Sequence, residues 1–232
     1  MARRSLGKLD ISVDFSRHLL GFEDFPREKR ADFAAIFGRS APLELEIGSG
    51  RGMFLGNTAV ARPEYDFLGV EIGRKYAKFC AILLAKRGIE NAKAFCGDAV
   101  RVLRELIDEN TLRAVHVYFP DPWWKRAHRK RRVLREETLR LIESRLETGG
   151  TMHFRTDVLE YYQSTLTLVA QTTSLEGPFE DPGNDGSGND DLEIGGSGND
   201  GPEIDGKAYR THFERRTLLH DEPVYRAVFR KT

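Results

Sequence analysis

Short apolar runs alternate along this chain with longer segments in which apolar residues recur every three or four positions. Five runs have the length and composition of buried strands, at residues 43–47, 67–71, 92–95, 114–119 and 150–155. Helical spacing follows each strand: in the segment that ends near residue 61, and at 74–87, 99–107, 133–146 and 157–171. Strands that alternate with helices in this way predict a parallel sheet covered on both faces.

The two ends of the chain depart from this alternation. Residues 1–40 are polar with scattered phenylalanines and predict an N-terminal arm that ends in a short helix near residues 27–37. Two further strands are expected at 208–215 and 224–230, and their short link predicts an antiparallel edge. We therefore expect the arm to precede one α/β domain over residues 41–232. Its sheet would be mostly parallel and seven-stranded, with an antiparallel edge strand.

The net charge of zero hides an uneven distribution of charge. Residues 176–205 hold ten acidic residues and no basic one, so the rest of the chain has 36 basic and 26 acidic residues. Within this part, residues 177–206 contain Gly-Ser-Gly-Asn-Asp twice and too few apolar residues to offset the entropy of ordering. We expect a flexible acidic insert on a basic body, and a basic body suits a nucleic-acid partner.

Composition excludes several other classes of protein. The two cysteines, Cys80 and Cys96, are far apart and lack metal-ligand spacing, which predicts buried thiols in a reducing compartment rather than a disulfide framework or a zinc site. No segment is apolar enough to span a membrane, and no apolar stretch follows the N-terminus as in a signal peptide. We expect a cytoplasmic protein with no membrane association, no metal and no obligate protein partner.

A glycine-rich turn joins the first predicted strand to its helix. The sequence from Glu46 to Gly52 is Glu-Ile-Gly-Ser-Gly-Arg-Gly, where Gly48, Gly50 and Gly52 allow the backbone to approach a ligand closely. The spacing differs from the dinucleotide pattern, and a carboxylate at residue 46 would repel a pyrophosphate but attract a cationic sulfonium amino acid. An ordinary strand-to-helix turn remains the alternative for the glycines alone.

Two further carboxylates follow the next two strands. Glu71 ends the second strand, where an acid commonly accepts hydrogen bonds from ribose hydroxyls, and Asp98 follows the third, where it would meet the edge of an adenine. Both stand just before helical segments, so each has a helix N-cap as its alternative role. Three acids at successive strand ends favour a shared nucleoside-binding edge.

The segment from Phe119 to Arg132 follows the fourth strand and carries the most specific signal. It reads Phe-Pro-Asp-Pro-Trp-Trp and continues into a basic run, with seven Lys or Arg residues and no acid between Lys125 and Arg135. The prolines stiffen the turn around Asp121, which therefore points to a reaction centre beside a cationic surface. A solvated charged face is the alternative for the basic run. Trp123 and Trp124 are suited to stack on bases, although we expect one of them to anchor the loop by packing.

These motifs resemble those of the bacterial tRNA (guanine-N7)-methyltransferases, a family of class I S-adenosylmethionine-dependent methyltransferases. The resemblance rests on the stretches Glu46–Gly52 and Phe119–Arg132, on Glu71 and Asp98, on Thr156-Asp157 with Tyr161, and on Thr211-His212-Phe213-Glu214. It implies a Rossmann-like fold and transfer of a methyl group from S-adenosyl-L-methionine to N7 of a guanine in tRNA. The expected acceptor is the variable-loop guanosine 46.

The resemblance also implies a role for each matching residue. Cofactor contacts are expected from Glu46, Gly48, Gly50, Gly52, Glu71, Asp98 and Asp121. Contacts to tRNA are expected from Lys125, Arg126, His128, Arg129, Lys130, Arg131 and Arg132, and from Asp157, Thr211, His212, Phe213 and Glu214. Asp121 is the expected catalytic residue: N7 already carries a free lone pair, so no base is needed, and a fixed carboxylate stabilises the positive charge that develops on the guanine.

Some positions depart from the family pattern or keep an alternative role. His212 stands where relatives usually carry Lys, which would make that contact depend on pH, and Ala127 stands where they usually carry Arg. Asp157 has the N-cap of the following helix as its alternative. Glu214 is equally suited to pair with a neighbouring arginine.

Three other functions compete with this hypothesis. A class I methyltransferase that acts on another RNA base or on a small molecule would share the sheet and the cofactor site; Pro122-Trp123 and the basic run disfavour it. A non-catalytic RNA-binding relative would have lost the cofactor carboxylates, which are present here. A nicotinamide oxidoreductase would require the other glycine spacing.

Overall fold

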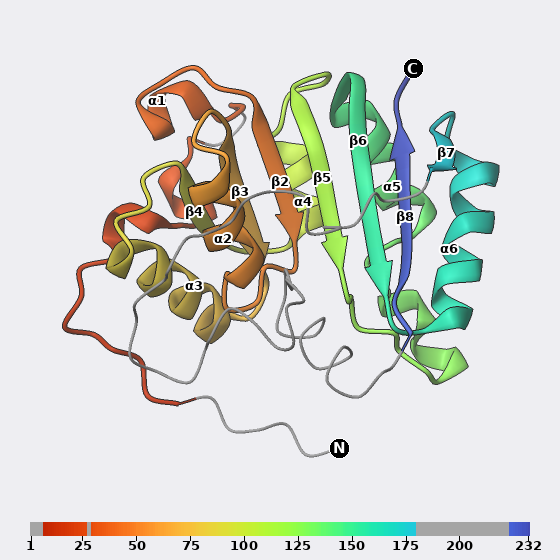
Figure 1. Cartoon of the computed structure of the whole chain (residues 1–232), viewed down its shortest axis with the longest axis horizontal. Coiled ribbons are helices and arrows are strands. Elements are labelled where there is room, and N and C mark those ends of the chain that lie inside the picture. The colour runs from red at the N-terminus through yellow and green to blue at the C-terminus, as the bar shows by residue number, and fades with distance from the viewer. Residues whose placement is uncertain (1–6, 27–28, 180–222) are drawn as a thin grey trace.

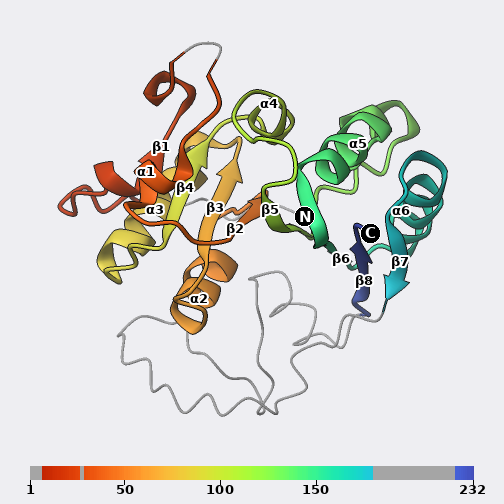
Figure 2. The ribbon, with the colours of Figure 1, turned by 90° about the horizontal axis from the view of Figure 1, so that it is seen from above.

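The computed structural model describes residues 7–26, 29–179 and 223–232. Within these ranges one eight-stranded sheet is formed, in the order β1-β4-β3-β2-β5-β6-β8-β7, and helices cover both of its faces (Figures 1 and 2). The predicted class, a mostly parallel sheet with antiparallel edge pairing and helices on both sides, is confirmed. The expected number of seven strands was wrong, since the described residues alone form eight.

The elements in these ranges lie close to the predicted ones. The strands are β1 Leu19–Leu20, β2 Leu43–Ile47, β3 Asp66–Glu71, β4 Ala92–Cys96, β5 Leu112–Tyr118, β6 Leu146–Thr156, β7 Glu176–Phe179 and β8 Tyr225–Arg230. The α-helices are α1 Phe33–Phe37, α2 Met53–Ala61, α3 Arg74–Lys86, α4 Ala99–Glu105, α5 Glu136–Arg145 and α6 Leu159–Thr172. Three 3-10 helices complete the set, η1 Ser16–His18, η2 Phe22–Asp24 and η3 Arg126–Arg131.

Two apolar layers sandwich the sheet. On one face α2 and α3 pack Leu55 and Leu84 against Phe67 of β3. On the other face α4, α5 and α6 cover Leu68 of β3 and Val115 of β5. Because both faces are covered, the central strands are apolar runs rather than alternating ones. None of the helices in the described ranges is long and apolar enough to cross a membrane.

The N-terminal arm packs onto the edge of the sheet. β1 pairs in parallel with β4, and Phe22 places its ring edge-on to Phe95 with the ring centroids 5.0 Å apart. The expected short helix is α1, which is capped by Asp32 and ends at the left-handed Gly38. A two-residue strand carries too little sequence pattern to be predicted, and β1 exists because β4 offers it an open edge.

The antiparallel edge differs in detail from the prediction. β8 pairs antiparallel with β6 and with β7, which is the outermost strand. β7 lies where the sequence predicted the start of the flexible insert, so that boundary was wrong for residues 177–179. Its Gly-Pro sequence has low strand propensity, and its pairing depends on β8. The predicted strand 208–215 and the remainder of the insert lie outside the described residues.

The parallel strands place the carboxyl ends of β2 to β6 along one edge, which is the lower edge in Figure 1. From β2 the chain proceeds to β3 and β4 on one side, and then β5 returns to pair with the other side of β2. This reversal creates a topological switch point between β2 and β5. In open α/β sheets, ligands bind outside the carboxyl ends of the strands at such a point.

Candidate functional site

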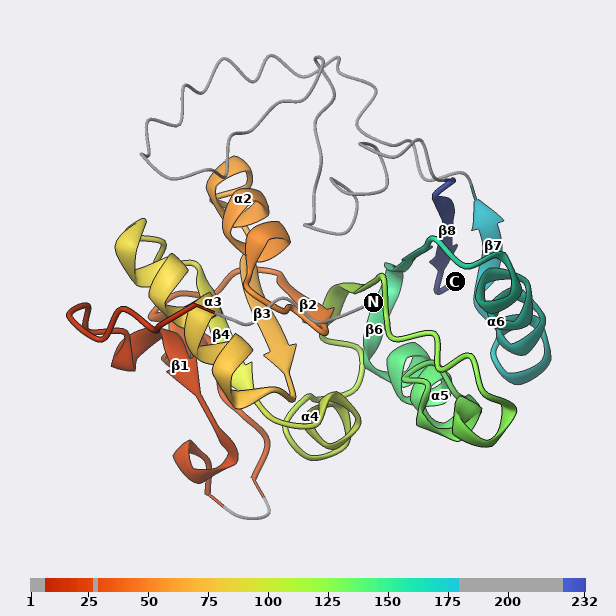
Figure 3. The same cartoon turned by 90° about the horizontal axis from the view of Figure 1, so that it is seen from below.

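Carboxylates follow or end each of the five central parallel strands at this edge. In sheet order they are Asp98 after β4, Glu71 in β3, Glu46 in β2, Asp121 after β5 and Asp157 after β6. Glu46 in β2 and Asp121 after β5 are therefore the two carboxylates next to the switch point. Figure 3 views the molecule from this side.

The glycine turn between β2 and α2 requires its glycines. Gly48, Gly50 and Gly52 have φ angles of 83°, 54° and 80°, which side chains rarely adopt. A Cβ atom at Gly52 would overlap the sulfur of Cys80, so this glycine allows α2 to pack closely on α3. A Cβ atom at Gly48 or Gly50 would meet no protein atom within 4 Å, so these two glycines border open space.

Glu71 holds the turn in place. Its Oε2 accepts a hydrogen bond from the backbone N–H of Gly50 at 3.0 Å, and its Oε1 accepts one from Gly73 at 2.7 Å. Each carboxylate oxygen retains a further lone pair for a hydroxyl group. Glu71 thus links the end of β3 to the glycine turn at the end of β2.

Glu46 is a buried carboxyl group without compensation. Only 4% of the residue is exposed, and its Oε2 has no hydrogen-bond partner among the described residues. Burial, together with the negative charge of Glu71, raises the pKa of Glu46 to about 8. A buried acid of this kind is poised to ionise when a cationic group binds beside it.

Asp98 has the N-cap role that the sequence left open. Its Oδ1 accepts hydrogen bonds from the backbone N–H groups of Val100 and Arg101, at 2.8 and 3.3 Å, in the first turn of α4. The same residue retains Oδ2 at the exposed end of the helix. A cap and a ligand contact are therefore compatible at this position.

Asp121 lies on a strained turn. The residues on either side of its Pro-Asp-Pro sequence, Phe119 and Trp123, have left-handed φ angles of 48° and 46°. Such conformations are uncommon for bulky residues and concentrate at functional sites, where the surrounding structure enforces them. Asp121 is exposed, and its carboxylate makes no hydrogen bond or ion pair with the described residues.

The two tryptophans of this loop have different environments. Trp123 packs within the loop, edge-on to His128 at 5.9 Å between ring centroids and under the guanidinium of Arg131 at 5.0 Å. Trp124 is 69% exposed. Trp123 is thus an anchor of the loop, whereas Trp124 presents a free aromatic face.

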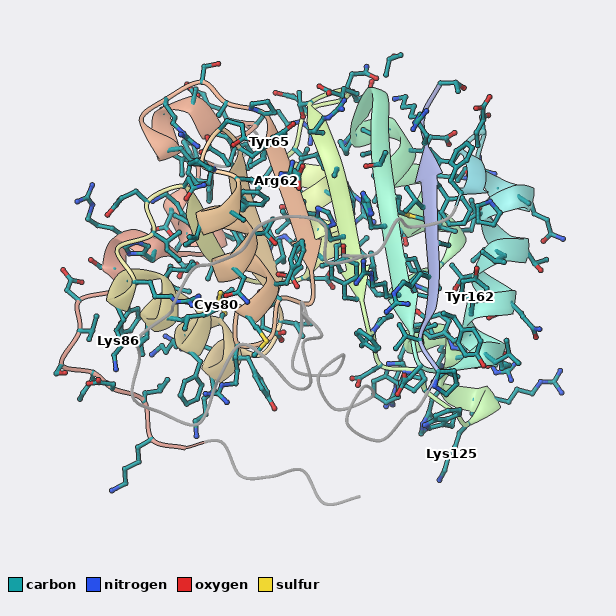
Figure 4. The ribbon with its side chains drawn as sticks, in the orientation of Figure 1. Arg62, Tyr65, Cys80, Lys86, Lys125 and Tyr162 are labelled. Carbon is teal, nitrogen blue, oxygen red and sulfur yellow. The ribbon has the colours of Figure 1, made fainter. Side chains whose placement is uncertain are left out.

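Most of the basic run is directed to solvent. Figure 4 shows Lys125 extending from the carboxyl edge of the sheet. The exposed basic residues of the run are Lys125, Arg126, Arg129, Lys130 and Arg131.

Arg132 requires a correction, because the sequence grouped it with the phosphate contacts. The residue is only 6% exposed. It donates hydrogen bonds to the carbonyl of Pro122, the carboxylate of Glu160 and the hydroxyl of Ser164. Its charge is therefore neutralised inside the protein, and sequence alone could not separate it from its five exposed neighbours.

Asp157 does not cap the helix that follows it. The N-cap of α6 is Val158, without a side-chain cap bond, and the Val158 N–H donates instead to Thr156. The half-buried Asp157 carboxylate has no hydrogen bond or ion pair with the described residues. The remaining predicted substrate residues, Thr211, His212, Phe213 and Glu214, lie outside the described residues.

A buried polar network between β2 and β5 was missed in the sequence. Glu44 receives two hydrogen bonds from Arg62, at 2.6 and 3.0 Å, and lies 2.9 Å from Nε2 of His116. Nδ1 of the same imidazole lies 2.9 Å from the hydroxyl of Tyr118. Arg62 in turn covers the ring of Tyr65 (Figure 4). The available signal was the acidic residue at every second position of an otherwise apolar strand.

The site fits a cationic nucleoside ligand. The uncompensated carboxyl of Glu46 suits a positive charge, and the space beside Gly48 and Gly50 admits a ligand close to the backbone. Across the described ranges, no group of three or more His, Cys, Asp or Glu side chains is placed to hold a metal ion.

Comparison with known proteins supports this interpretation. Residues 40–186 match a family model described as a putative methyltransferase. A tRNA (guanine-N7)-methyltransferase of Rhodopirellula baltica is 38% identical, with coverage of 100% of this chain and 80% of that protein. The corresponding enzyme of Escherichia coli K12 is 41% identical over 69% of this chain and 62% of its own length. The enzyme of Idiomarina loihiensis is 41% identical, with coverage of 60% of this chain and 57% of its own length. The chain therefore aligns with less than two thirds of these last two relatives.

Solved structures show the same fold at low sequence identity. The aminoglycoside-resistance methyltransferase NpmB1 has a TM-score of 0.54 at 15% identity, with coverage of 88% of this chain and 95% of that one. A 30S ribosomal A1408 methyltransferase from an uncultured bacterium has a TM-score of 0.50 at 17% identity, with coverage of 88% and 96%. These structures support the fold and do not identify the substrate.

Proposed function

Because this chain belongs to the tRNA (guanine-N7)-methyltransferase family, we propose that it transfers a methyl group from S-adenosyl-L-methionine to N7 of a guanine in tRNA. The product is 7-methylguanosine, and the proposed acceptor is guanosine 46 of the variable loop. One observation in particular supports this: the glycine turn and the strained Asp121 turn leave adjacent strands at the switch point, next to five exposed basic residues. Action on tRNA places the protein, in this proposal, in the cytoplasm.

The cofactor would be held by the edge from β4 to β2. When bound, S-adenosyl-L-methionine supplies a methyl group activated by a sulfonium. Glu46 would hold the cationic amino-acid end, since the described residues give its buried carboxylate no counter-charge. Glu71 would accept from ribose hydroxyls and Asp98 from the exocyclic amine of the adenine. Gly48 and Gly50 would allow the close approach.

Asp121 would act on the guanine. The N7 lone pair is free in the neutral base, so the protein needs to align it and has no proton to remove. Positive charge develops on the ring as N7 is alkylated, and a carboxylate held on a rigid turn stabilises that charge without reorganising. The left-handed residues on either side of Asp121 give the turn this rigidity. Asp157 is the second candidate for holding the guanine.

The tRNA would lie across the carboxyl edge. The exposed residues Lys125, Arg126, Arg129, Lys130 and Arg131 would contact phosphates, with His128 as a further donor. The free face of Trp124 would stack on a base. The proposal also includes contacts to the tRNA from four residues whose role rests on the sequence resemblance alone, Thr211, His212, Phe213 and Glu214.

One experiment tests the proposal directly. An unmodified tRNA transcript is incubated with the protein and methyl-labelled S-adenosyl-L-methionine, and the labelled nucleotide is located by borohydride and aniline scission. We expect scission at guanosine 46 of the variable loop. Label at another nucleotide, or no incorporation, would contradict the proposed acceptor.

The role of Asp121 is tested by Asp121→Asn. Loss of the charge should lower kcat about 100-fold, with the Kd of S-adenosylhomocysteine within a few-fold of wild type. Asp108→Asn is the matched control, because Asp108 is an exposed aspartate whose one ion pair with a described residue is with Arg30 at 3.5 Å. Equal losses of cofactor affinity and turnover would instead assign Asp121 to the cofactor.

A further inference from the structure

The turn that carries Asp121 has little support from its own backbone. Pro120 and Pro122 have no N–H group to donate. Residues 120–124 make no backbone–backbone hydrogen bond with the rest of the described chain. Two left-handed residues add conformational strain, on the order of 1–3 kcal/mol each for non-glycine residues. A turn of this kind keeps one conformation only if other groups hold it.

Arg132 supplies that support. Its Nε donates to the carbonyl of Pro122 at 2.9 Å, which is the residue directly after Asp121. The other side of the same guanidinium donates to Glu160 at 2.6 Å and to Ser164 at 3.2 Å. The guanidinium also lies over the ring of Tyr161, 4.3 Å from its centroid. One planar group thus ties the turn to the first and second turns of α6.

The anchor on α6 is rigid where it meets Arg132. Tyr161 is among the largest fully buried side chains and packs edge-on to Phe154 of β6. Glu160 lies in the first turn of the same helix and also contacts Arg129 at 3.3 Å. A guanidinium with five fixed donors can satisfy a carbonyl, a carboxylate and a hydroxyl at once, which an ammonium on a flexible stem cannot do with the same geometry.

We propose that Arg132 and Glu160 are positioning residues for methyl transfer, because their ion pair fixes the turn that presents Asp121 to the guanine. The expected changes in kcat rest on the proposed function. In this proposal Arg132 supports the turn rather than binding phosphate, although it belongs to the basic run. Neither residue touches the substrate, so both act through the position of Asp121.

Intrinsic fluorescence gives a readout that needs no activity. The chain has two tryptophans, Trp123 and Trp124, and both lie in this loop. In a Trp124→Phe background, Trp123 is the sole reporter. Arg132→Met or Glu160→Gln should increase acrylamide quenching of Trp123 at least two-fold and lower its anisotropy.

Kinetics gives the second readout. A displacement of about 1 Å at a reacting group costs up to about 100-fold in rate. We expect Arg132→Met to lower kcat 30- to 100-fold and Glu160→Gln about ten-fold, with KM for tRNA and Kd for S-adenosylhomocysteine within three-fold of wild type. Arg132→Lys should recover only part of kcat, because lysine restores the positive charge without the planar set of donors of the guanidinium.

Two control variants distinguish a positioning effect of Arg132 from the loss of a positive charge and from a loss of stability. Arg129→Ala removes an exposed partner of the same Glu160 and should raise KM for tRNA without changing Trp123 quenching. Arg145→Met removes another buried arginine, bonded to Leu103 and Glu109 far from the loop, and should lower stability while kcat of the folded protein is unchanged.

The outcomes are distinguishable. If wild type does not methylate tRNA, the proposed function fails, whereas the fluorescence comparison still tests the anchor. Wild-type kcat and wild-type Trp123 quenching in Glu160→Gln would overturn the inference. Should Arg132→Met not fold, Glu160→Gln decides the question, since Glu160 is partly exposed and its replacement leaves the core intact.

Discussion

Glu44 and Glu46 lie two positions apart on the same face of β2, and their surroundings give them opposite acidities. Burial alone would raise the pKa of Glu44, but the contacts of His116 and Arg62 outweigh it and lower the value to about 2. Glu46 has no such partner in the part of the chain that the structure describes, and its pKa rises to about 8. One carboxylate is therefore satisfied within the protein and the other is available to a ligand.

The first prediction concerns Glu44. A carboxyl whose pKa is depressed in the folded state adds stability above its unfolded value near 4.5, and that stability is lost as the pH falls toward 2. Glu44→Ala should lower the free energy of unfolding by about 3–5 kcal/mol at pH 7, because it leaves Arg62 and His116 without their partner. Urea unfolding should show the difference from wild type shrinking between pH 4.5 and pH 2.

The control for this prediction is Glu105→Ala. Glu105 forms an exposed ion pair with Arg101 one helical turn away, and such pairs contribute little. An equal loss of stability in the two variants would show that burial of Glu44 is not responsible.

The second prediction concerns Glu46, whose charge changes the stability of the protein in the opposite direction from that of Glu44. A carboxyl whose pKa is raised in the folded state destabilises the protein increasingly as the pH rises from about 4.5 to about 8. Glu46→Gln should therefore stabilise the ligand-free protein at pH 8, by an amount on the order of a few kcal/mol, and leave it nearly unchanged at pH 4. The same variant should bind S-adenosylhomocysteine at least ten-fold more weakly.

Thermal unfolding at pH 4 and pH 8 and calorimetric titration check these two effects. A variant that is less stable than wild type at pH 8 would show that Glu46 has a stabilising partner after all. Unchanged affinity would remove Glu46 from the proposed cofactor site.

At the scale of elements, the glycine turn is set by the packing of two helices. Gly52 is left-handed and lies against Cys80 of α3, whereas Gly38 at the end of α1 is left-handed with no atom within 4 Å of a Cβ. The two positions share the backbone requirement and differ in the space available. They therefore form a matched pair for mutation.

The third prediction uses this pair. Gly38→Ala should lower stability by about 1 kcal/mol, the usual effect of a left-handed alanine. Gly52→Ala should lower stability by at least twice as much and weaken binding of S-adenosylhomocysteine, because α2 must move away from α3 and displace the glycine turn. The double variant with Cys80→Ala should recover part of the loss. Equal effects at the two glycines would show that the contact with Cys80 is unimportant.

At the scale of the whole molecule, charge is concentrated where the strands end. The exposed basic residues of the 125–131 loop lie at the same edge as the five carboxylates, so the edge can attract RNA phosphates on one side and hold a cationic cofactor on the other. The neutral overall charge says nothing about this arrangement.

The fourth prediction follows from the basic loop. Binding of tRNA should weaken steeply with salt, with a slope of about −4 in log K against log salt concentration if the five exposed residues contact phosphates. Arg131→Ala should reduce the slope by about one. Arg113 is an exposed arginine that pairs with Glu147, and Arg113→Ala should leave the slope unchanged. Filter binding at several salt concentrations measures both slopes. A slope near zero would place the RNA elsewhere.

Several features were predictable because they are local. The strand-to-helix alternation follows from hydrophobic periodicity, and the glycine turn from the backbone angles that glycine permits. The Pro-Asp-Pro turn follows from the loss of two donors. For Asp98 the sequence offered a cap and a ligand contact, and the structure realises the cap without excluding the contact.

Features that depend on distant partners were not predictable. Arg131 and Arg132 are adjacent residues of the same type, and only the position of α6 makes one exposed and the other buried. Val158, which makes no side-chain cap bond, occupies the N-cap position for which Asp157 was the sequence candidate. β7 has weak propensity and forms because β8 is beside it.

The sequence by itself determined the fold class, the glycine turn and the identity of the groups that can carry charge at the strand ends, since these depend on periodicity and on the chemistry of single residues. The tertiary structure alone decided which charges are compensated. Glu44 and Arg132 have partners contributed by distant elements, whereas Glu46 and Asp121 have none among the described residues. The free energy of a charge depends on the groups around it in space, and the order of residues along the chain does not specify them.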